Sequence, residues 1–470
     1  MKLTYGISDK PKFGQLVVFA IQQLLAIMAA TLVVPVITGN GMSPAAALFG
    51  AGAGTLVYVL FTKAKSPVFL GSSFAFLGSM ATAFAGAVSM AVGYLGLIIG
   101  AVFAGLVYVA IAIAVKIAGV NWLNKLMPPV VIGPTVAIIG LSLAGNAVGD
   151  LQKGGVMASV MQWVVSNEGV ASQVESFVPT ANVLLCVLCG LVTLAVTMLC
   201  STFGKKMIKL IPFIIGILAG YATATVFTLI GSATGNAALQ IVNFGVFSNL
   251  LVDGKVALSS FFQVPSFTFL TALGGFSEIT GQYIGTIAVA YVPVALVVFA
   301  EHVADHKNIS SIIEKDLLED PGLSRTLLGD GVGSMVGAFF GGCPNTTYGE
   351  SVACVAITGN ASVVTIIAAA IGAILVSFLS PFVAFVNSIP ACVMGGVCIA
   401  LYGFIAVSGL KMIQNVDLEG NHNLFVVSTI LVCGIGGLAL TFGKITVTSI
   451  ATALILGIFA NQMLSRKKKA

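Results

Sequence analysis

The sequence predicts an all-α protein that crosses a membrane many times, and three observations lead to that fold class. Of the 470 residues, 58% are hydrophobic and only 8% are charged, whereas a soluble chain carries about a quarter charged residues. Apolar runs recur along the whole chain, and runs of about 20 residues are long enough to cross a lipid bilayer as helices. The 54 glycines suit membrane helices, in which small residues let backbones approach closely. The lipid bilayer is therefore the predicted surrounding of this chain.

Fourteen segments at membrane depth are predicted in order along the chain. The polar N-terminal residues lead directly into the first apolar run, so no cleavable signal peptide is expected. The segments are expected at residues 14–37, 44–62, 67–88, 92–117, 128–147, 180–200, 207–231, 284–304, 324–341, 345–358, 362–386, 390–410, 423–442 and 445–464. The third and tenth are irregular because each is short and opens with polar or small residues. The loops at 148–179 and 232–283 are rich in Ser, Thr, Asn and Gly and are expected to be irregular or interfacial.

The positions of Lys and Arg predict the orientation of these segments. If the N-terminus is cytoplasmic, the loops after even-numbered segments should be basic. Those loops and the two termini hold Lys2, Lys10, Lys12, Lys63, Lys65, Lys116, Lys125, Lys205, Lys206, Lys209, Lys307, Lys315, Arg325, Lys411, Arg466, Lys467, Lys468 and Lys469. The opposite side has little more than Lys153, Lys255 and Lys444. This predicts an even number of segments in a multi-pass plasma-membrane protein whose N- and C-termini are both cytoplasmic. The net charge of +5 reflects this topology and does not indicate binding to nucleic acid.

Two similar stretches suggest an internal repeat. PPVVIGPTVAIIGLSLAG begins at Pro128 and PACVMGGVCIALYGFIAVSG begins at Pro390, each with a glycine five residues after the proline. They head the fifth and twelfth predicted segments, and the same offset pairs the irregular third and tenth. An odd repeat length inserts the two halves in opposite orientations. The sequence therefore predicts two inverted repeats of seven segments.

The third and tenth segments are each predicted to begin with a short extended strand followed by a half-helix. Pro67 and Pro344 disfavour helix in the residue before them, and the β-branched Thr346 and Thr347 suit an extended strand. Unpaired backbone at this depth is tolerated only inside the protein or along a cavity. Two such strands could pair and direct two helix N-termini at one central point, where free N–H groups would bind carbonyl oxygens of a ligand.

Two acidic residues lie at membrane depth, where a charged side chain usually marks a site or a pathway. Glu301 lies in the eighth segment and Glu350 in the tenth, and Asp305 follows Glu301 by four residues on the same helix face. Proton-coupled transport requires at least one carboxyl group whose protonation changes with the side of the membrane from which water reaches it. The alternative for Glu301 and Glu350 is a snorkelling or helix-capping carboxylate, and for Asp305 a solvated helix end.

Other reactive residues do not form a recognisable site. His302 and His306 are possible proton carriers, but His302 is expected to face away from Glu301 and His306 to reach the cytoplasmic loop. The chain has only three histidines, so no metal cluster and no cofactor are predicted. Cys186 and Cys189 form a CxxC inside an apolar run, which indicates packing residues rather than a metal or redox site. An enzyme is not predicted, since neither a metal cluster nor a nucleophile–base pair is recognised.

The predicted site matches a planar heterocycle with alternating N–H and C=O edges. It combines backbone donors near Phe74 and Gly349, two carboxylates, and aromatic faces from Phe74 and Tyr348. Carboxylates accept hydrogen bonds from ring N–H groups, backbone N–H groups donate to carbonyls, and the ring lies on an aromatic face. Sugars and lipids match this set less well.

Several motifs spread over the chain resemble those of the nucleobase–ascorbate transporter family, and within it the uracil permeases of bacteria. They are TLVVPVITG, SPVFLGSSFAFLGS, FAEHV, KDLLEDPGL, CPNTTYGES and VMGGVCIALYG. The resemblance implies a core domain from segments 1–4 and 8–11 (residues 1–127 and 284–389). It also implies a gate domain from segments 5–7 and 12–14 (residues 128–283 and 390–470, with a basic tail). Proton symport and a possible homodimer are further implications. By position, the family's substrate contacts fall on Phe74, Glu301, Gly349 and Glu350, with Tyr402 as a helper from the gate side.

The sequence departs from this family pattern in ways that bear on the substrate. Uracil permeases usually have histidine four residues after the glutamate. This chain has Asp305 there instead, and many purine-type members also have aspartate at this position. The family's Gln-His pair in the first segment is Gln22-Gln23. The wider family's Asn-x-Gly after Glu350 reads Ser351-Val352-Ala353, and its Thr-Arg ending reads Thr358-Gly359. The leading hypothesis is a proton-coupled importer of a nucleobase, most readily uracil. The alternatives are a permease for xanthine or another purine, and an anion exchanger of the related sulfate/bicarbonate carrier architecture.

Overall fold

The computed structural model describes residues 3–119, 121–165, 171–205, 207–252, 254–414, 416–442 and 445–465. Eight helices among them are long and apolar enough to cross a membrane. The prediction of a mostly helical, multi-pass fold is therefore confirmed, while the count of fourteen segments stays a prediction. The basic tail at 466–470 lies outside the described residues, as do Lys2, Lys206 and Lys444.

The chain forms two compact units. The first contains residues 1–142, 264–379 and 402–470, and the second contains residues 143–263 and 380–401. Each is described below by itself. The division into a core and a gate domain stays a prediction.

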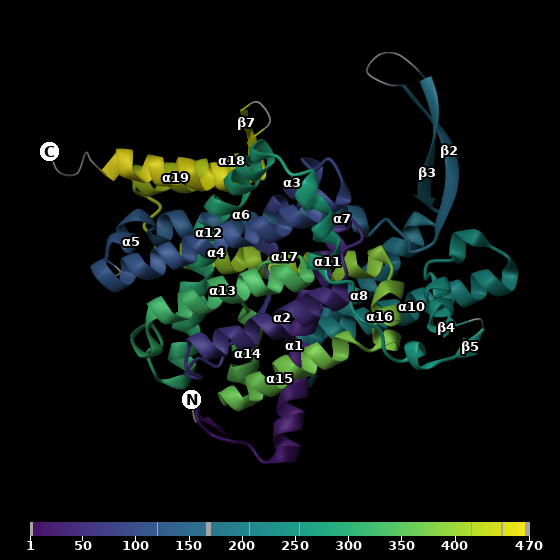
Figure 1. Ribbon diagram of the computed structural model, residues 1–470, viewed down its shortest axis with the longest axis horizontal. Helices are drawn as coiled ribbons and strands as arrows, with labels where there is room; N and C mark the ends of the chain where they lie inside the picture. Colours follow the sequence, from purple (N-terminus) through teal and green to yellow (C-terminus); the bar gives the residue numbers. More distant parts are fainter. Residues whose placement is uncertain are drawn as a thin grey trace. The chain divides into compact units, whose positions relative to one another are not determined.

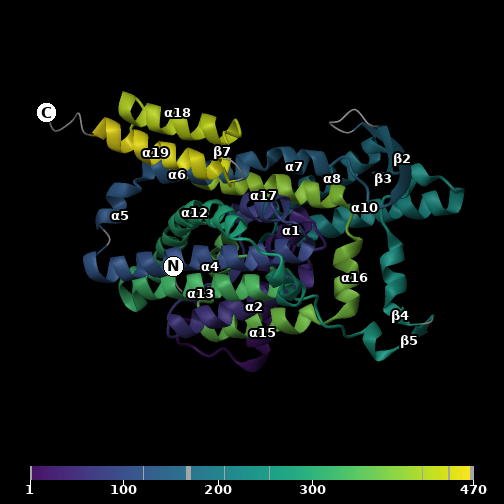
Figure 2. The same ribbon diagram turned by 45° about the horizontal axis from the view of Figure 1, so that its top comes forward.

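The first unit is built around long helices that pack side by side. They are α1 (Phe13–Thr38), α2 (Pro44–Phe61), α4 (Met90–Ala118), α12 (Gly281–Ile313), α13 (Leu323–Gly341) and α15 (Val363–Ser377). Helices α4, α13, α2 and α15 are successive neighbours in Figures 1 and 2. Helix α2 begins sharply because Pro44 occupies its first turn and the Ser43 hydroxyl accepts the Ala46 N–H.

Glycines allow α2 and α13 to come into backbone contact. A Cβ at Gly50 would lie 2.5 Å from the carbonyl oxygen of Gly337, and a Cβ at Gly54 would lie 2.6 Å from that of Gly333. Each pair is spaced four residues apart on its own helix, so the glycines share one helix face. This close packing places α13 directly beside the segment that follows α2.

Two short strands cross inside the first unit, as predicted for the third and tenth segments. Strand β1 (Leu70–Ser72) pairs antiparallel with β6 (Asn345–Thr347), and Gly71 lies opposite Thr346. A short helical turn, η1 (Phe74–Phe76), and helix α3 (Leu77–Ala85) follow β1. Helix α14 (Gly349–Thr358) follows β6. The predicted strand-then-half-helix arrangement and the pairing of the two strands are confirmed.

Several predicted helices are interrupted in the structure. The fifth divides into α6 (Pro129–Ser142) and α7 (Ala144–Asp150), and the eleventh ends at Ser377 before α16 (Ser380–Ser388) begins. A single helix over 362–386 is wrong because Pro381 is tolerated in the first turn of a new helix but not in the interior of an old one.

The last two predicted segments are shorter than expected and are joined by a hairpin. Helix α18 (Asn421–Ile435) and helix α19 (Ser449–Ser465) flank strands β7 (Leu440–Phe442) and β8 (Ile445–Val447). The predicted helix at 423–442 is wrong beyond Ile435. Gly436 and Gly437 follow the helix, and Gly437 has a φ of 72°, a conformation that other residues rarely adopt.

The shorter elements of the first unit connect these helices. They are α5 (Asn121–Leu126), α11 (Thr268–Ala272), η5 (Leu273–Ser277) and the turn η6 (Leu318–Gly322) between α12 and α13. Helix α12 continues nine residues beyond the predicted end at 304, through the polar run HKNISSII.

Helix α6 and the later part of α17 (Ala391–Met412) pack in opposite directions within the first unit. Each helix begins directly after the proline that heads its repeat stretch, Pro128 or Pro390. A Cβ at Gly133 would lie 2.9 Å from the Gly409 carbonyl oxygen, and one at Gly140 would lie 2.2 Å from that of Tyr402. The opposite orientation fits an inverted repeat, which nevertheless stays a prediction.

The second unit contains helices and a long hairpin. Helices α8 (Val183–Phe203) and α10 (Pro212–Thr234) pack together and are joined by α9 (Met207–Leu210). Strands β2 (Met157–Val165) and β3 (Ala171–Pro179) pair antiparallel along their whole length. Residues 157–179 are therefore not irregular, and the alternative that this loop is interfacial stays a prediction. The part of the loop from 232 that belongs to the second unit holds the short elements η2 (Ala237–Leu239), η3 (Phe244–Leu250), β4 (Leu251–Val252), β5 (Lys255–Val256) and η4 (Leu258–Ser260).

The N-terminal residues 3–9 form a strap against the end of α14. The Thr4 and Tyr5 N–H groups donate to the Gly359 carbonyl, and the Ala361 N–H donates to the Tyr5 carbonyl at 2.9 Å. Leu3 and Ile7 pack on the apolar cluster that includes Val352 and Val355 of α14. The strap is thus held by backbone pairing and by apolar contact.

Candidate functional site

The N-termini of η1 and α14 lie at the two ends of the β1–β6 crossing. Phe74 opens η1 and is 8% exposed, and its ring contacts that of Tyr402 edge to face with centroids 5.8 Å apart. Gly349 opens α14 and is exposed, so its backbone is open to a ligand. Uncompensated N–H groups at such helix starts attract carbonyl oxygens and anions.

Three carboxyl groups gather beside the start of α14. Glu301 and Asp305 lie one turn apart on α12, and Glu350 lies in the first turn of α14. Each interacts electrostatically with the others. A Cβ built on Gly349 would lie 3.9 Å from Oδ1 of Asp305. The structure therefore brings together the acids that the sequence singled out.

Asp305 is attached to the crossing strands. The Thr347 hydroxyl of β6 donates to Oδ2 of Asp305 at 2.8 Å, and the Asp305 side chain is buried. This hydrogen bond fixes α12 against β6. A solvated helix end, the alternative considered for Asp305, is wrong because the chain continues as helix to Ile313. Glu301 and Glu350 are each partly exposed, as a ligand-facing group must be.

Tyr348 lies within the crossing. Its hydroxyl donates to the Ser72 carbonyl at 2.6 Å, and its ring covers Gly71, where a Cβ would come within 2.4 Å of it. The side chain is 4% exposed. The contacts of Tyr348 therefore join β1 to β6. The aromatic pair near η1 is formed by Phe74 and Tyr402.

Ser351 connects three elements through one hydroxyl. Its Oγ accepts a hydrogen bond from the Gln23 side-chain amide of α1 and another from the Phe69 N–H at 3.0 Å. Gln23 and Ser351 are both buried. Since Ser351 directly follows Glu350, this contact fixes the first turn of α14 relative to α1 and to the start of β1.

Two buried polar residues, His302 and Asp330, lie behind Glu301 and are not among the predicted substrate contacts. His302 and Asp330 are fully buried, and His302 Nδ1 lies 2.7 Å from Asp330 Oδ2. His302 does face away from Glu301, as expected. Asp330 was overlooked although it is a lone acid in the apolar run 324–341, and that isolation was the available signal.

His306 does not reach a cytoplasmic loop, so that expectation is wrong. It is fully buried, with Nε2 2.7 Å from the Tyr58 hydroxyl and Nδ1 2.8 Å from the His302 carbonyl oxygen. No group of three His, Cys, Asp or Glu side chains that could hold a metal ion occurs among the described residues. Cys186 and Cys189 are buried in α8 with free thiols.

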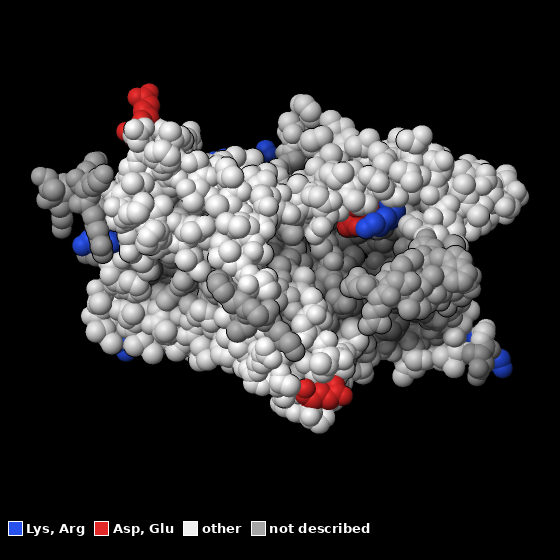
Figure 3. Space-filling view, turned by 90° about the horizontal axis from the view of Figure 1, so that it is seen from above, with Lys and Arg blue, Asp and Glu red and all other residues white. Residues whose placement is uncertain are grey.

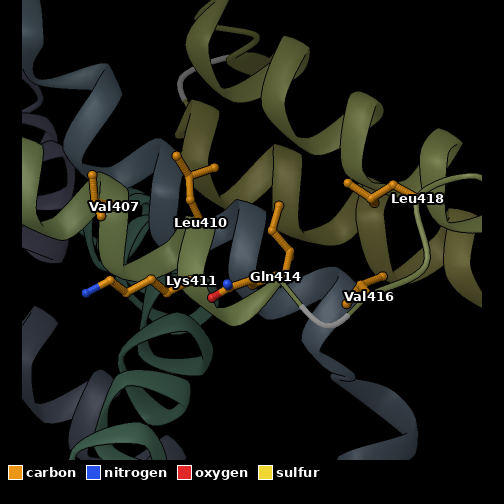
Figure 4. Close-up of a pocket in the computed structure, with 7 residues that line it drawn as sticks. Val407, Leu410, Lys411, Gln414, Val416 and Leu418 are labelled. Carbon is orange, nitrogen blue, oxygen red and sulfur yellow. The ribbon is translucent and has the colours of Figure 1, made fainter.

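A pocket at the end of α17 is separate from these acids. Charged side chains occur only in a few small groups on the face shown in Figure 3, as expected for a chain surrounded by lipid. A pocket of about 440 Å³ lies at the end of α17, lined by Val407, Leu410, Lys411, Ile413, Gln414, Val416 and Leu418 (Figure 4). None of the predicted site residues lines it.

Comparison with known proteins gives a consistent result over nearly the whole sequence. A family model, Xan_ur_permease, described as Permease family, matches residues 14–442. The chain is 37% identical to the uracil permease of Bacillus caldolyticus, covering 100% of this chain and 96% of that protein. It is 36% identical to the uracil permease of Bacillus subtilis, covering 100% and 97%. For the uracil permease of Escherichia coli K12, the identity is 33% and the coverage 96% and 92%.

Solved structures with a similar fold are much more distant in sequence. The transmembrane domain of the cyanobacterial bicarbonate transporter BicA superposes with a TM-score of 0.60 at 15% identity, covering 97% of this chain and 99% of that chain. The murine anion transporter Slc26a9 in its inward-facing state gives a TM-score of 0.64 at 11% identity, covering 98% and 69%. At these identities the likeness establishes a shared membrane-transporter fold and nothing about the solute.

Proposed function

The chain belongs to the Permease family whose model spans residues 14–442, and from that membership we propose that it imports a nucleobase, with uracil first among the substrates. Transport is coupled to a proton and proceeds by alternating access in the plasma membrane, with both termini in the cytoplasm. The relatives of 33% to 37% identity that are named uracil permeases support the choice of substrate.

One observation carries the proposal: three carboxyl groups gather at the start of the half-helix α14, whose preceding strand β6 pairs with the strand that leads into η1. A flat ring with amide-like edges uses both kinds of group, because carboxylates accept from its N–H groups and helix N-termini donate to its carbonyls. In this proposal Glu301 is the principal ligand and carries a proton, and Asp305 modulates its protonation. Glu350 orients the ring.

The remaining substrate contacts are assigned to the aromatic pair and to exposed backbone. Phe74 provides a face on which the ring lies, supported from its edge by Tyr402. The exposed Gly349 supplies a backbone donor with no side chain in the way. Tyr348 holds the two strands, and thereby the two helix ends, in register. A homodimer remains part of the proposal through the family resemblance.

Replacing Glu301 tests the proposed role directly. In proteoliposomes, Glu301→Ala should lower uracil uptake about ten- to a hundredfold, since a charged hydrogen bond is worth about 1.5–3 kcal/mol. The variant should still melt cooperatively, which separates loss of function from misfolding. Glu278→Ala, at an exposed acid in the loop before α12, serves as the control and should transport normally. Unchanged uptake in Glu301→Ala would remove this residue from the mechanism.

The substrate is tested by competition and by thermal shift. Uracil, xanthine, uric acid, adenine and ascorbate should be compared at two pH values, with uracil expected to stabilise the protein most. Xanthine is the second candidate because Asp305 occupies the position at which uracil permeases usually have histidine. Anion exchange is disfavoured by the three acids at the site. Sulfate or bicarbonate flux without uracil flux would reverse this order.

A further inference from the structure

A histidine–aspartate pair lies behind the face of α12 that carries Glu301. His302 is the residue after Glu301, and Asp330 lies in the middle of α13. The side chains have no exposed surface, and His302 Nδ1 lies 2.7 Å from Asp330 Oδ2. Neither residue has a role in the substrate site described above. An ionisable pair at this depth is expensive to bury, which points to a function.

The neighbours of His302 hold its ring in one place. Nε2 lies 3.0 Å from the Thr326 hydroxyl, which also lies 3.1 Å from the Leu323 carbonyl oxygen. A hydroxyl both donates and accepts, so Thr326 satisfies Nε2 whether or not that nitrogen carries a proton. The His306 ring stacks on that of His302 with centroids 4.0 Å apart. His302 can therefore keep its Nδ1–H directed at Asp330.

The second oxygen of Asp330 is left without such a contact. Asp330 Oδ1 is buried and has no hydrogen-bond partner among the described residues, and the same holds for the hydroxyl of Tyr108 on α4. Tyr108 interacts electrostatically with both Asp330 and Glu301. A buried carboxylate oxygen without a partner is costly in a medium of low dielectric constant. A proton on Oδ1 removes that cost.

From this geometry we propose that Asp330, positioned by His302, is a second proton-binding group that exchanges the transported proton with Glu301. The inference rests on the proposed proton-coupled transport. In the exchange, the O–H bond of the Glu301 carboxyl breaks and an O–H bond forms at Asp330 Oδ1. The negative charge moves from Asp330 to Glu301. His302 donates its Nδ1–H to Oδ2 in both states and so keeps the Asp330 carboxyl in place.

Several carboxyl groups lie around the His302–Asp330 pair, and bound protons can neutralise their charge. The groups that face the pair are Glu301, Asp305 and His306 on α12, Tyr108 on α4 and Tyr58 on α2, while Glu350 on α14 interacts with Glu301 and Asp305. Within the described part of the chain, no lysine or arginine forms an ion pair with any of these acids. Four carboxyl groups without a cation can share one proton or more as the site opens and closes.

The test compares two transport modes of the full chain in proteoliposomes. Uptake driven by a pH gradient requires the proton to be released, whereas exchange of labelled for unlabelled uracil at equal pH does not. Asp330→Asn should lower gradient-driven uptake at least about tenfold and leave exchange within about twofold of the unmodified protein. An internal pH dye should report the same loss of uracil-dependent proton entry. Ser334→Ala, one turn further along the same buried helix face, should alter neither mode.

A second pair of variants separates positioning from proton binding. Asparagine at position 302 can offer a side-chain N–H near the place of Nδ1, so His302→Asn should keep at least half of the gradient-driven uptake, and His302→Leu should resemble Asp330→Asn. Equal loss of exchange and gradient-driven uptake in a folded Asp330→Asn protein would overturn the proposal, as would normal gradient-driven uptake. If the unmodified protein shows no proton-dependent uracil uptake, the proposed function itself fails.

Discussion

Ser351 shows how a single hydroxyl can set the geometry of the site. It lies one residue after Glu350 and accepts hydrogen bonds from Gln23 and from the Phe69 N–H. These donors belong to α1 and to the residue before β1, which are far apart in sequence. The position of Glu350 therefore depends on contacts between its own helix and distant parts of the chain.

Ser351→Ala should weaken substrate binding more than it slows turnover. The change leaves a buried amide and a buried N–H without an acceptor, which costs about 1–3 kcal/mol, and the first turn of α14 should loosen. We expect KM for uracil uptake to rise about three- to tenfold, with the maximal rate within about twofold.

The control is Ser377→Ala on α15, where the hydroxyl bonds only to the preceding turn of its own helix. That variant should keep the KM of the unmodified protein. A Ser351→Ala protein with unchanged KM would show that the contact does not position Glu350.

The residues at the site differ in how readily they are found from sequence. Glu301 and Glu350 are recognisable because each is an acid at the end of an apolar run. Asp330 is also an acid within an apolar run, at residues 324–341, but the predicted site does not include it. The contacts of His306 and Ser351 could not be found, since they depend on which helix packs against which, and no local pattern specifies that.

At the scale of elements, the contact between α2 and α13 depends on the absence of side chains. A Cβ at Gly54 would lie 2.6 Å from a backbone oxygen of α13. Backbone cannot rotate away as a side chain can, so the two helices would have to separate. Because α13 also touches the β1–β6 crossing, that separation would reach the site.

Gly54→Ala should therefore destabilise the protein in spite of the higher helix propensity of alanine. Overpacking of this kind costs about 1–3 kcal/mol, which should lower the melting temperature measured in detergent by several degrees. Gly78→Ala is the matched control, because nothing lies within 4 Å of a Cβ there. The control should be neutral or slightly stabilising. Equal melting temperatures for both variants would contradict the packing argument.

An ion-pair cluster fixes the turn between α12 and α13 to the end of α2. Asp320 of η6 accepts a hydrogen bond from Lys65 at 2.5 Å and lies 3.2 Å from Lys315. The hydrogen bond from Lys65, followed by that from Lys315, lowers the pKa of the Asp320 carboxyl. The cluster is largely solvated, so each contact contributes only modestly.

The contribution of Asp320 to stability should depend on pH. The pKa of Asp320 in the folded protein lies below its value in the unfolded chain, which is about 4. The stabilisation is therefore fully present above the unfolded pKa and is lost as pH falls through the folded pKa. Asp320→Asn should lower the melting temperature at pH 7, and the difference from the unmodified protein should shrink below about pH 4. Glu319→Gln, at a neighbouring exposed acid, should show no such trend. A difference that does not change with pH would exclude the ion pairs as its cause.

The sequence is informative about elements wherever one residue type fixes the backbone. Pro67 and Pro344 predict the two segments in which a strand precedes a half-helix. Pro381 is the corresponding signal for the break before α16. The loop at 148–179 is polar overall, which favours an irregular structure, while the strand-forming residues of MASVMQWVV are the local signal for the β2–β3 hairpin. The predicted end of α12 is too early because its last turns contain several polar residues, although the buried Ile309 and Ile313 keep a spacing of four residues.

At the scale of the whole molecule, the distribution of lysines predicts which loops share a side of the membrane. Lys307 and Lys255 are exposed and belong to opposite sides in the proposed topology. The eight native cysteines are all buried or half-buried, so their background labelling should be low.

A membrane-impermeant maleimide should distinguish the two positions. In intact cells it should label Lys255→Cys but not Lys307→Cys, and in inverted vesicles the preference should reverse. Both variants should keep uracil uptake, which shows that they insert normally. Labelling of both positions from the same side would contradict the proposed topology.

The strap at residues 3–9 has a consequence for how the protein is made. Its partners around Gly359 are synthesised long after it leaves the ribosome, so the first residues of the chain wait unpaired while most of the membrane segments are inserted. The strap can support α14, the half-helix that bears Glu350, only after residues 3–9 have folded onto the later-made residues around Gly359. An affinity tag placed at the C-terminus leaves that late step undisturbed, whereas one fused to the first residue interferes with it.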